Sequence, residues 1–420
     1  MLHWNPLLIA FLAVFALSLA SRLGLRWLNV RNLRVHGHKV PEVFKDQIEP
    51  ETLSRMRDYT VSSSNVGSLE IFADDLASLV LILSGLLPFL AGSGLLTGLH
   101  PVAAGLVFIL ACSVILGAVE IPFDLYSTFV IERRFGFSTI TFALWLRDLG
   151  KTLLLSGIIS GGILAVFLGL IYAMPRMWWL PAWACFVLFQ LGLTWLYPRI
   201  IAPLFNRFEP VDDESLRERI NALLERAGFH LEGLFKMDAS TRSRHSNAYF
   251  TGIGSHKRIV LFDTLLTTHT PEEIGAVLAH ELGHLKKGHI RKQLAASVII
   301  SLAVLYAASR FLAWPLLYET FGFSVPVPYA GLFLLAILAR PFAFFLTPVG
   351  SMVSRRYERQ ADTFARQLTG TSAPLAQALK RLARENLANL HPHPLYAWFY
   401  YSHPPLVDRI ESLERMDARP

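Results

Sequence analysis

Two histidines and a glutamate near the middle of the chain have the spacing of a catalytic metal site. His280, Glu281 and His284 form an H-E-x-x-H pattern. Residues four apart on a helix share a face, so both imidazoles can converge on one tetrahedral ion while Glu281 lies beside the open coordination position. The pattern therefore predicts two metal ligands and a general base. The alternative is that both histidines are ordinary polar residues on a helix that enters a membrane.

A third ligand is expected from another helix. A histidine six residues after the second one is excluded because position 290 is Ile, and we interpret His289 as a residue of the membrane interface. Glu358 and Asp362 share a face of a later helical stretch. We expect Glu358 to complete a site for one catalytic Zn²⁺ and Asp362 to support a ligating histidine. A solvated charged face, with Glu358 paired to a neighbouring arginine, is the alternative.

The helix that carries the motif has a clear beginning. Thr270, Pro271 and Glu273 supply an N-cap, a proline at the first helical position and a capping-box glutamate. This start signal predicts that the two histidines lie on a stable helix.

The polar segment 199–291 is predicted to form a small α+β metalloprotease domain around that helix. An amphipathic helix is expected over Glu214–Ala227, with Gly228 as its C-terminal cap. Three strands are also expected, the last two joined by a Gly-containing turn: Leu234–Met237, Asn247–Thr251 and Arg258–Phe262.

The composition indicates a mainly α, polytopic membrane protein. Of 420 residues, 53% are hydrophobic and 17% are charged, with a mean hydropathy of +0.42, which excludes an ordinary water-soluble enzyme. The net charge of +7 is expected from basic cytoplasmic loops, so no nucleic-acid partner is predicted. Cys112 and Cys185 lie in apolar runs and are interpreted as small core residues.

Seven apolar runs have roughly the 20-residue length that a membrane-spanning helix needs. They are Pro6–Ala20, Ala77–Thr97, Val102–Val119, Thr152–Met174, Trp178–Tyr197, Gln293–Trp314 and Tyr329–Val349. The predicted organisation is therefore helices one to five in 1–198, the protease domain in 199–291, helices six and seven in 292–350, and a C-terminal segment with the third ligand in 351–420.

The distribution of basic residues predicts the orientation. Arg22, Arg26 and Arg31 follow the first run, whereas the loop Pro315–Pro328 has no Lys or Arg. By the positive-inside rule, the N-terminus is expected outside, and the protease domain and the C-terminal segment in the cytoplasm. The bilayer would be the inner or plasma membrane in a bacterium and a membrane of the endoplasmic reticulum type in a eukaryote.

Further segments match, in one order along the chain, the motifs of a known family. They are Ile121–Phe123 with Tyr126, Phe129–Glu132, Ile201–Phe205, His245–Phe250, Arg258–Leu266, the H-E-x-x-H motif, Ser354–Asp362 and Ser402–Pro405. On these segments the sequence resembles the type I CAAX prenyl proteases, integral-membrane zinc endopeptidases of the gluzincin group. The resemblance implies seven transmembrane helices around a large intramembrane chamber, with the zinc site at its cytoplasmic end.

The resemblance also implies roles for individual residues. It implies the zinc ligands and the base already proposed: His280, His284, Glu358 and Glu281. It implies a strand that aligns the substrate backbone: Asn247, Ala248, Tyr249 and Phe250. His403, together with Arg409, matches positions that stabilise the tetrahedral intermediate. By itself, a histidine before two prolines is more typical of a turn.

The expected activity is hydrolysis of peptide bonds near the C-terminus of CAAX-type, prenylated substrates, by a zinc-activated water with Glu281 as general base. One alternative is a membrane quality-control protease of broad specificity. From a different class, a seven-helix transporter or receptor with a structural zinc is a further alternative, although a structural site would need a fourth protein ligand. The sequence indicates no oligomeric state.

Overall fold

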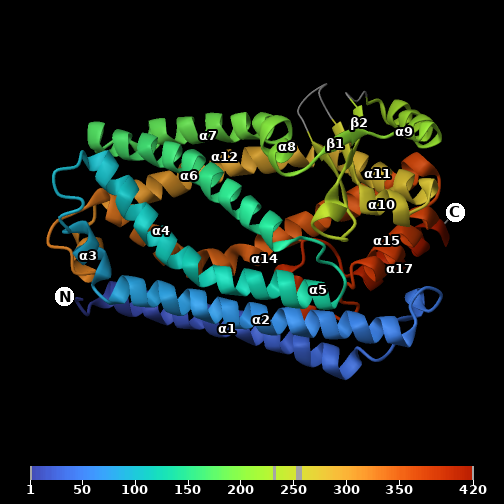
Figure 1. Ribbon diagram of the computed structural model, residues 1–420, viewed down its shortest axis with the longest axis horizontal. Helices are drawn as coiled ribbons and strands as arrows, with labels where there is room; N and C mark the ends of the chain where they lie inside the picture. The colour runs from blue at the N-terminus through green and yellow to red at the C-terminus, as the bar shows by residue number, and fades with distance from the viewer. Residues whose placement is uncertain (1, 230–232, 252–257, 419–420) are drawn as a thin grey trace.

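The protein has a long helical bundle with a smaller mixed domain at one end (Figure 1). The computed structural model describes residues 2–229, 233–251 and 258–418. The N-terminus lies at the end of the bundle away from the sheet, and the C-terminus lies on the side of the sheet. This architecture confirms the predicted class, a mainly α membrane protein with a small α+β domain.

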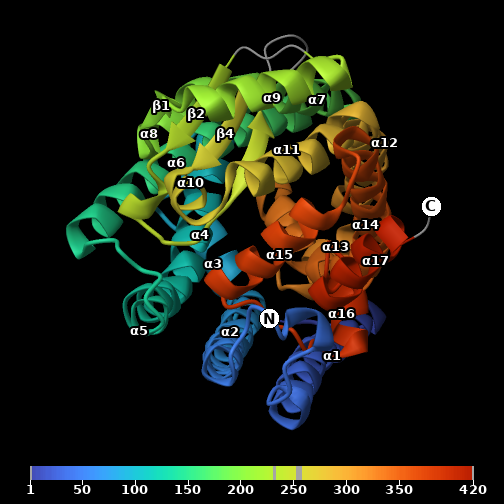
Figure 2. The same ribbon diagram turned by 90° about the vertical axis from the view of Figure 1, so that its right-hand side faces the viewer.

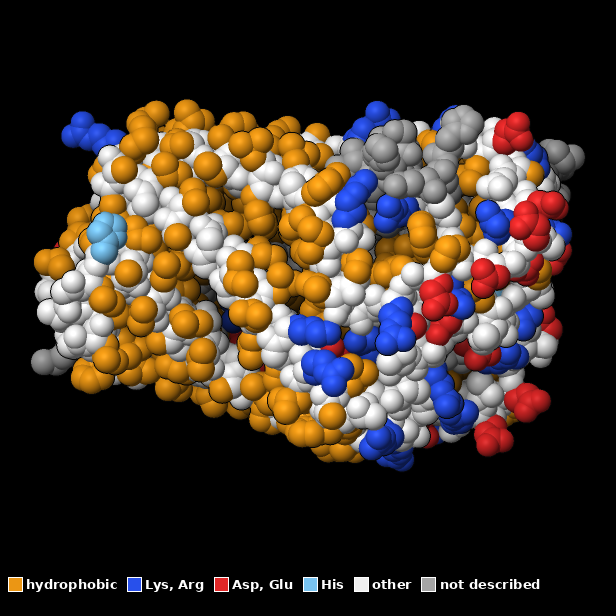
Figure 3. Space-filling view, turned by 45° about the horizontal axis from the view of Figure 1, so that its top comes forward, with side chains coloured by type: hydrophobic (Ala, Val, Ile, Leu, Met, Phe, Trp, Pro, Cys, Tyr) orange, Lys and Arg blue, Asp and Glu red, His pale blue; other side chains and the backbone are white. Residues whose placement is uncertain are grey.

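Seven helices in the described chain have 18 or more residues. They are α1 (Pro6–His36), α2 (Pro50–Leu83), α4 (Pro101–Tyr126), α6 (Phe142–Ala173), α7 (Trp179–Leu196), α12 (His289–Leu312) and α14 (Pro328–Thr369). All except α2 are long and apolar enough to cross a membrane. In Figure 3, hydrophobic side chains dominate the half of the surface formed by the bundle, whereas charged side chains gather around the mixed domain.

The predicted second span, Ala77–Thr97, is wrong in position. Helix α2 begins 27 residues earlier, at Pro50, and ends at Leu83; the short helix α3 (Leu86–Ala91) and a series of turns follow. The hydropathy pattern missed α2 because its second half carries Glu70, Asp74 and Asp75. Two of these charges are paired inside the protein, Asp75 with Arg22 of α1 and Asp74 with Arg340 of α14. The polar face of α2 therefore packs against other helices.

Few residues in the apolar helices of the bundle are buried within the chain. In the most apolar stretches of α6, α7 and α12, the buried shares of residues are 11%, 6% and 0%. Helix α12 nevertheless packs against both α7 and α14. Apolar side chains that are not buried within the chain are expected where helices face lipid. Figure 2 shows the long helices arranged around the axis of the bundle.

The mixed domain contains a four-stranded sheet of order β1-β2-β4-β3. Its strands are β1 (Phe208–Pro210), β2 (Gly233–Met237), β3 (Ala248–Thr251) and β4 (Arg258–Phe262). β2 and β4 are parallel, whereas β1 and β3 run antiparallel to their neighbours, which leaves β3 at one edge. The three expected strands are confirmed. β1 was missed because three residues with a proline carry no alternation. The expected turn between β3 and β4 lies outside the described residues.

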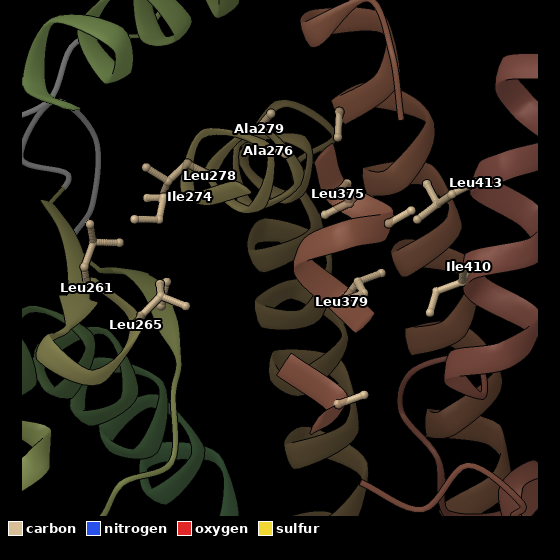
Figure 4. Close-up of a cluster of buried hydrophobic side chains, with 14 of the residues drawn as sticks. Leu261, Leu265, Ile274, Ala276, Leu278, Ala279, Leu375, Leu379, Ile410 and Leu413 are labelled. Atoms are coloured by element: carbon tan, nitrogen blue, oxygen red, sulfur yellow. The ribbon is translucent and has the colours of Figure 1, made fainter. Parts of the chain in front are cut away.

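Helix α11 (Pro271–Lys286) lies at the centre of this domain (Figure 4). Its predicted capping box is present, with Thr270 and Glu273 bonded reciprocally. On one side it packs Ile274 and Leu278 toward Leu261 of β4 and Leu265 of α10 (Asp263–Thr268). The predicted amphipathic helix is also confirmed as α9 (Glu214–Ala227), and Gly228 caps it in the left-handed conformation, with φ 73°.

Helix α15 (Ala373–Glu385) covers the other side of α11, and α17 (Leu406–Ala418) packs against α15. Helix α16 (Pro394–Tyr400) packs against α14 and α1. Leu375 and Leu379 of α15, with Ile410 and Leu413 of α17, belong to the same hydrophobic cluster as α11 (Figure 4). Helix α14 continues without a break across residue 350, from the bundle into this domain. A single helix thus runs from the membrane region to the domain, where it packs against the motif helix.

Candidate metal centre

A close crossing of α11 and α14 creates the site. At Gly283, an added Cβ atom would lie 2.8 Å from the Cα and 2.9 Å from the carbonyl oxygen of Ala361. Because the neighbouring atoms belong to the backbone and cannot rotate away, only glycine permits this approach. The crossing lies between the two motif histidines on α11 and between the two predicted acidic residues on α14. It therefore brings these four side chains together.

The three predicted ligands converge. His280 Nε2 lies 3.3 Å from Glu358 Oε2, and His284 Nε2 lies 3.3 Å from Glu358 Oε1. The two Nε2 atoms are 3.2 Å apart. One donor atom from each of the three residues lies within 4.8 Å of the others. Although His280 and Glu358 are 78 residues apart in the sequence, the two imidazoles and the carboxylate therefore face one point.

The environment of Glu358 fits a cation. Its side chain is 5% exposed, and Oε2 is buried without a hydrogen bond in the part of the chain that the structure describes, with the Arg409 guanidinium 3.5 Å away. A buried carboxylate oxygen without a donor is costly, whereas a divalent cation would satisfy it. Two nitrogens and one carboxylate are also the ligand set of a catalytic zinc site with an open position. The residues present therefore fit a metal ion.

Asp362 fixes the orientation of His280. Its Oδ1 lies 2.8 Å from His280 Nδ1, so Nδ1 carries the proton and the Nε2 lone pair points toward Glu358. Arg409 holds Asp362 in turn with two hydrogen bonds, from Nε to Oδ2 at 2.9 Å and from the guanidinium to Oδ1 at 2.7 Å. Burial and Arg409 act to lower the pKa of His280, but the two carboxylates raise it above its ordinary value. The pocket thus favours positive charge.

His284 has an equivalent support that sequence reasoning missed. Its Nδ1 lies 3.0 Å from Nδ1 of His289, whose Nε2 lies 2.9 Å from Gln360 Oε1. Because the amide oxygen only accepts, His289 donates from Nε2 and accepts at Nδ1, which leaves the Nε2 lone pair of His284 free for a metal. His289 is 2% exposed and stacks on Tyr357, so its interpretation as an interfacial residue is wrong. Its position five residues after His284 was the only signal.

Glu281 lies beside the two ligands on the same helix. Its side chain is half-buried, and this burial raises the pKa of the carboxyl group, with a further contribution from the charge of Glu358. The imidazoles of His280 and His284 oppose the rise. A carboxylate with a raised pKa, next to the open side of a metal site, is a better proton acceptor than an ordinary carboxylate.

His403 also reaches the centre, from the turn before α17. Its Nε2 lies 3.4 Å from Glu358 Oε1, and its side chain is 57% exposed. The other predicted C-terminal residue, Arg409, is buried and contacts Asp362 and His280. The two residues therefore differ: His403 faces the space in front of the ligands, whereas Arg409 supports them from behind.

The predicted substrate strand lies at the edge of the sheet next to α11. Asn247 precedes β3 and is exposed, and its carbonyl oxygen accepts a hydrogen bond from Phe262 N. Ala248 is buried, while Tyr249 and Phe250 are half-buried. In the described part of the sheet, β3 pairs only with β4, so its second edge has no strand partner. An edge strand beside a metal site has backbone groups available for an extended peptide.

A group of four side chains, here called the strand clamp, holds the start of β3: Tyr59, Glu132, His245 and Asn386. Tyr59 donates to Glu132 Oε1 at 2.7 Å, and His245 Nε2 lies 3.2 Å from Glu132 Oε2. His245 Nδ1 lies 3.1 Å from Asn386 Oδ1, and the same oxygen accepts from Ser246 N at 3.1 Å. The clamp therefore joins α2, α5 (Glu132–Arg134), β3 and the end of α15.

A bundle of apolar helices, with an H-E-x-x-H helix and a carboxylate as third ligand at one end, defines an integral-membrane metallopeptidase. Residues 29–207 match the family model described as CAAX prenyl protease N-terminal, five membrane helices. Residues 210–417 match peptidase family M48. Membership of a peptidase family contradicts the alternative of a transporter or receptor with a structural zinc.

Several known proteins are similar over nearly their whole length. CAAX prenyl protease 1 of Saccharomyces cerevisiae is 36% identical, covering 91% of this chain and 90% of that protein. The CAAX prenyl protease 1 homolog of Arabidopsis thaliana is 34% identical, covering 90% and 91%. The crystal structure of S. mikatae Ste24p superimposes with a TM-score of 0.91 at 31% identity, covering 98% of this chain and 100% of that chain. The chain therefore belongs to the CAAX prenyl protease family of M48 peptidases.

Proposed function

We propose that this protein is a zinc endopeptidase that cleaves peptide bonds near the C-terminus of prenylated, CAAX-type substrates. The observation that carries the proposal is the convergence of His280, His284 and Glu358 at the α11–α14 crossing, with Glu281 beside them. The likeness to proteins named CAAX prenyl protease, over about nine-tenths of both chains, supports the substrate class.

The residues of the centre have distinct tasks in this reaction. Zn²⁺, held by the two imidazoles and Glu358, would lower the pKa of a bound water toward neutrality. Glu281 would accept a proton from the attacking water and return it to the leaving amine. His403 faces the same space and donates to the developing oxyanion. Asp362 and Arg409 keep His280 oriented throughout.

The substrate backbone pairs with the edge of β3. Main-chain hydrogen bonds from Asn247, Ala248, Tyr249 and Phe250 would hold an extended peptide across the front of α11. This pairing aligns the scissile bond and selects no particular side chain. Selection for a prenylated C-terminus then depends on the long helices of the bundle. In the most apolar stretches of α6, α7 and α12, few side chains are buried, so apolar side chains remain available to contact a prenyl group.

The active site faces the cytoplasm in this proposal, and the N-terminus lies on the opposite side of the membrane. The N-terminus and the mixed domain lie at opposite ends of the bundle, which supports opposite sides (Figure 1). Basic side chains gather around the mixed domain, as expected for a cytoplasmic face (Figure 3).

A second candidate function is broad-specificity quality control, and one observation favours it: recognition through an edge strand does not require a prenyl group or a fixed sequence. Mass spectrometry of products from a farnesylated CAAX peptide and from an unrelated unfolded peptide separates the two. Cleavage of the first alone, abolished by a chelator, supports maturation of prenylated substrates. Equal cleavage of both supports quality control, and cleavage of neither contradicts the peptidase proposal.

A further inference from the structure

Behind the metal centre, a cavity of about 870 Å³ opens between α1, α14, α16 and α17. Asp362 and Arg409 form part of its wall, so the cavity and the centre are separated by a single layer of side chains. Its lining residues do not include strand β3, Glu281 or His403, which face the proposed peptide. The cavity is therefore a space that the proposed cleavage reaction does not use.

The cavity has an excess of positive charge. Four flexible basic side chains line it: Lys39, Arg355, Arg359 and Arg415. Its acidic lining residues are Asp362, which is bonded to Arg409, and Asp408. Arg355 donates to the carbonyl oxygens of Ala397 and Tyr401, and Arg415 lies 3.5 Å from Glu411.

Two of these cations have no anionic partner. Within the described chain, no carboxylate forms an ion pair with the side chain of Lys39 or Arg359. The hydrogen bonds of Lys39 and Arg359 in the described chain come from their backbones: His391 donates to the carbonyl oxygen of Lys39 at 2.7 Å, Lys39 N donates to His36 O, and Thr363 donates to the carbonyl oxygen of Arg359. A concave surface with unpaired cations attracts an anion.

The rest of the wall is mostly apolar, with Asn32, His36, His391 and Ser412 as its polar members, and it lies where the lipid-facing surface ends. On α14, the exposed hydrophobic residues continue through Met352 and Val353, and Arg355 follows two residues after Val353. On α16, Trp398 lines the cavity and is 47% exposed. Tryptophan and arginine at the boundary of an apolar belt are typical of the interface between lipid headgroups and water. The cavity thus combines a cationic rim with an apolar wall at headgroup level.

From this combination we propose that the cavity binds the headgroup of an anionic phospholipid from the leaflet on the side of the mixed domain. The phosphate would pair with Lys39 and Arg359, and the upper part of an acyl chain would lie along Trp398. A zwitterionic lipid carries its own cation and would gain little from these residues. The inference is independent of the peptidase proposal, because it concerns different residues and a different ligand.

Native mass spectrometry of the full chain in detergent, with added phosphatidylglycerol or phosphatidylcholine, tests the proposal. The protein is expected to retain phosphatidylglycerol in preference to phosphatidylcholine. The double variant Lys39→Gln, Arg359→Gln is expected to bind phosphatidylglycerol about 25-fold more weakly, because each basic side chain near the lipid contributes roughly a fivefold factor. A matched control, Arg133→Gln with Arg134→Gln, removes two exposed charges from α5, away from the cavity, and should bind like the wild type.

Three results would overturn the proposal. The first is equal retention of the two lipids by the wild-type chain. The second is an equal loss in both double variants, which would indicate nonspecific attraction to net charge. The third is displacement of phosphatidylglycerol by millimolar inorganic phosphate, which would assign the cavity to a soluble anion. Thermal unfolding of each variant verifies that the chain is folded, and neither double variant alters a residue of the metal centre.

Discussion

Two polar clusters lie close to the proposed substrate path, and they differ in how completely their hydrogen bonds are satisfied. In the strand clamp, both nitrogens of His245 face acceptors, Glu132 and Asn386. In the metal centre, Glu358 Oε2 is buried without a hydrogen bond in the described chain, and two Nε2 lone pairs face the same point. The clamp is complete as it stands, whereas the centre is complete only with a cation.

The comparison separates two tasks that one active site needs. A cluster with every donor matched to an acceptor holds one geometry and resists change. A cluster whose protons are all directed away from a shared point keeps that point available for a metal and a water. We therefore expect changes in the centre to affect chemistry and changes in the clamp to affect substrate alignment.

The largest expected effect is on turnover, from Glu281→Gln. The variant keeps both imidazoles and Glu358, so its metal content should equal that of the wild type. Loss of the base should lower kcat on the order of 10²- to 10⁴-fold. Peptide hydrolysis and metal content are measured on the same preparation. Wild-type turnover in this variant would exclude Glu281 as the base.

Gly283→Ala should produce the next largest effect, on the geometry of the centre. The new Cβ meets the backbone of Ala361 at 2.8 Å, so α11 and α14 must separate, at a cost of about 1–3 kcal/mol in the free energy of unfolding. Metal affinity should fall at least about tenfold, as for loss of a support of the ligands. Gly275→Ala on the same helix is the matched control, since its Cβ would meet only the side chains of Leu223 and Arg219, at 3.4 and 3.8 Å. Equal metal affinity in both variants would show that the crossing does not control the site.

His245→Ala should have a smaller effect, confined to alignment. Removing the imidazole leaves Glu132 and Asn386 without a shared partner, and loss of such buried hydrogen bonds costs roughly 1–2 kcal/mol. KM should rise about tenfold while the metal content stays unchanged. A fall in metal content would instead show that the strand clamp supports the metal ligands. His245→Gln, which keeps one donor, should recover part of the loss.

The smallest expected effect is a pH dependence of stability from the same residue. Burial acts to lower the pKa of His245, but the hydrogen bonds to Glu132 and Asn386 outweigh it and raise the pKa above its ordinary value of 6.5. The protonated form is therefore favoured by folding, so its stabilisation is fully present below pH 6.5 and declines as the pH rises through the raised pKa. The thermal midpoint should fall over that range in the wild type and less in His245→Gln. An identical pH profile would refute the assignment.

The sequence was sufficient wherever a feature depends on neighbouring residues. The capping box of α11, the cap at Gly228 and the strand Arg258–Phe262 follow from local patterns and are confirmed. The spacing within H-E-x-x-H likewise indicated a shared face. The third ligand was predicted from a different helix, on the shared face of Glu358 and Asp362, and the structure places Glu358 beside both rings.

Features that depend on distant partners were not predictable in this way. Tyr59 and Glu132 are separated by 73 residues, and His245 and Asn386 by 141, so no local pattern indicates the clamp. Helix α2 was displaced in the prediction because its charges are neutralised by α1 and α14. His289 was misinterpreted for the same reason: its partner Gln360 comes from another helix.

The metal content of the purified full chain, determined by inductively coupled plasma mass spectrometry, tests the central claim most directly. The wild type and Glu281→Gln should each hold one zinc ion per chain, and Glu358→Gln should hold far less, because the amide removes the negative charge between the two imidazoles. Stoichiometric zinc in Glu358→Gln, or no bound metal in the wild type, would contradict the account.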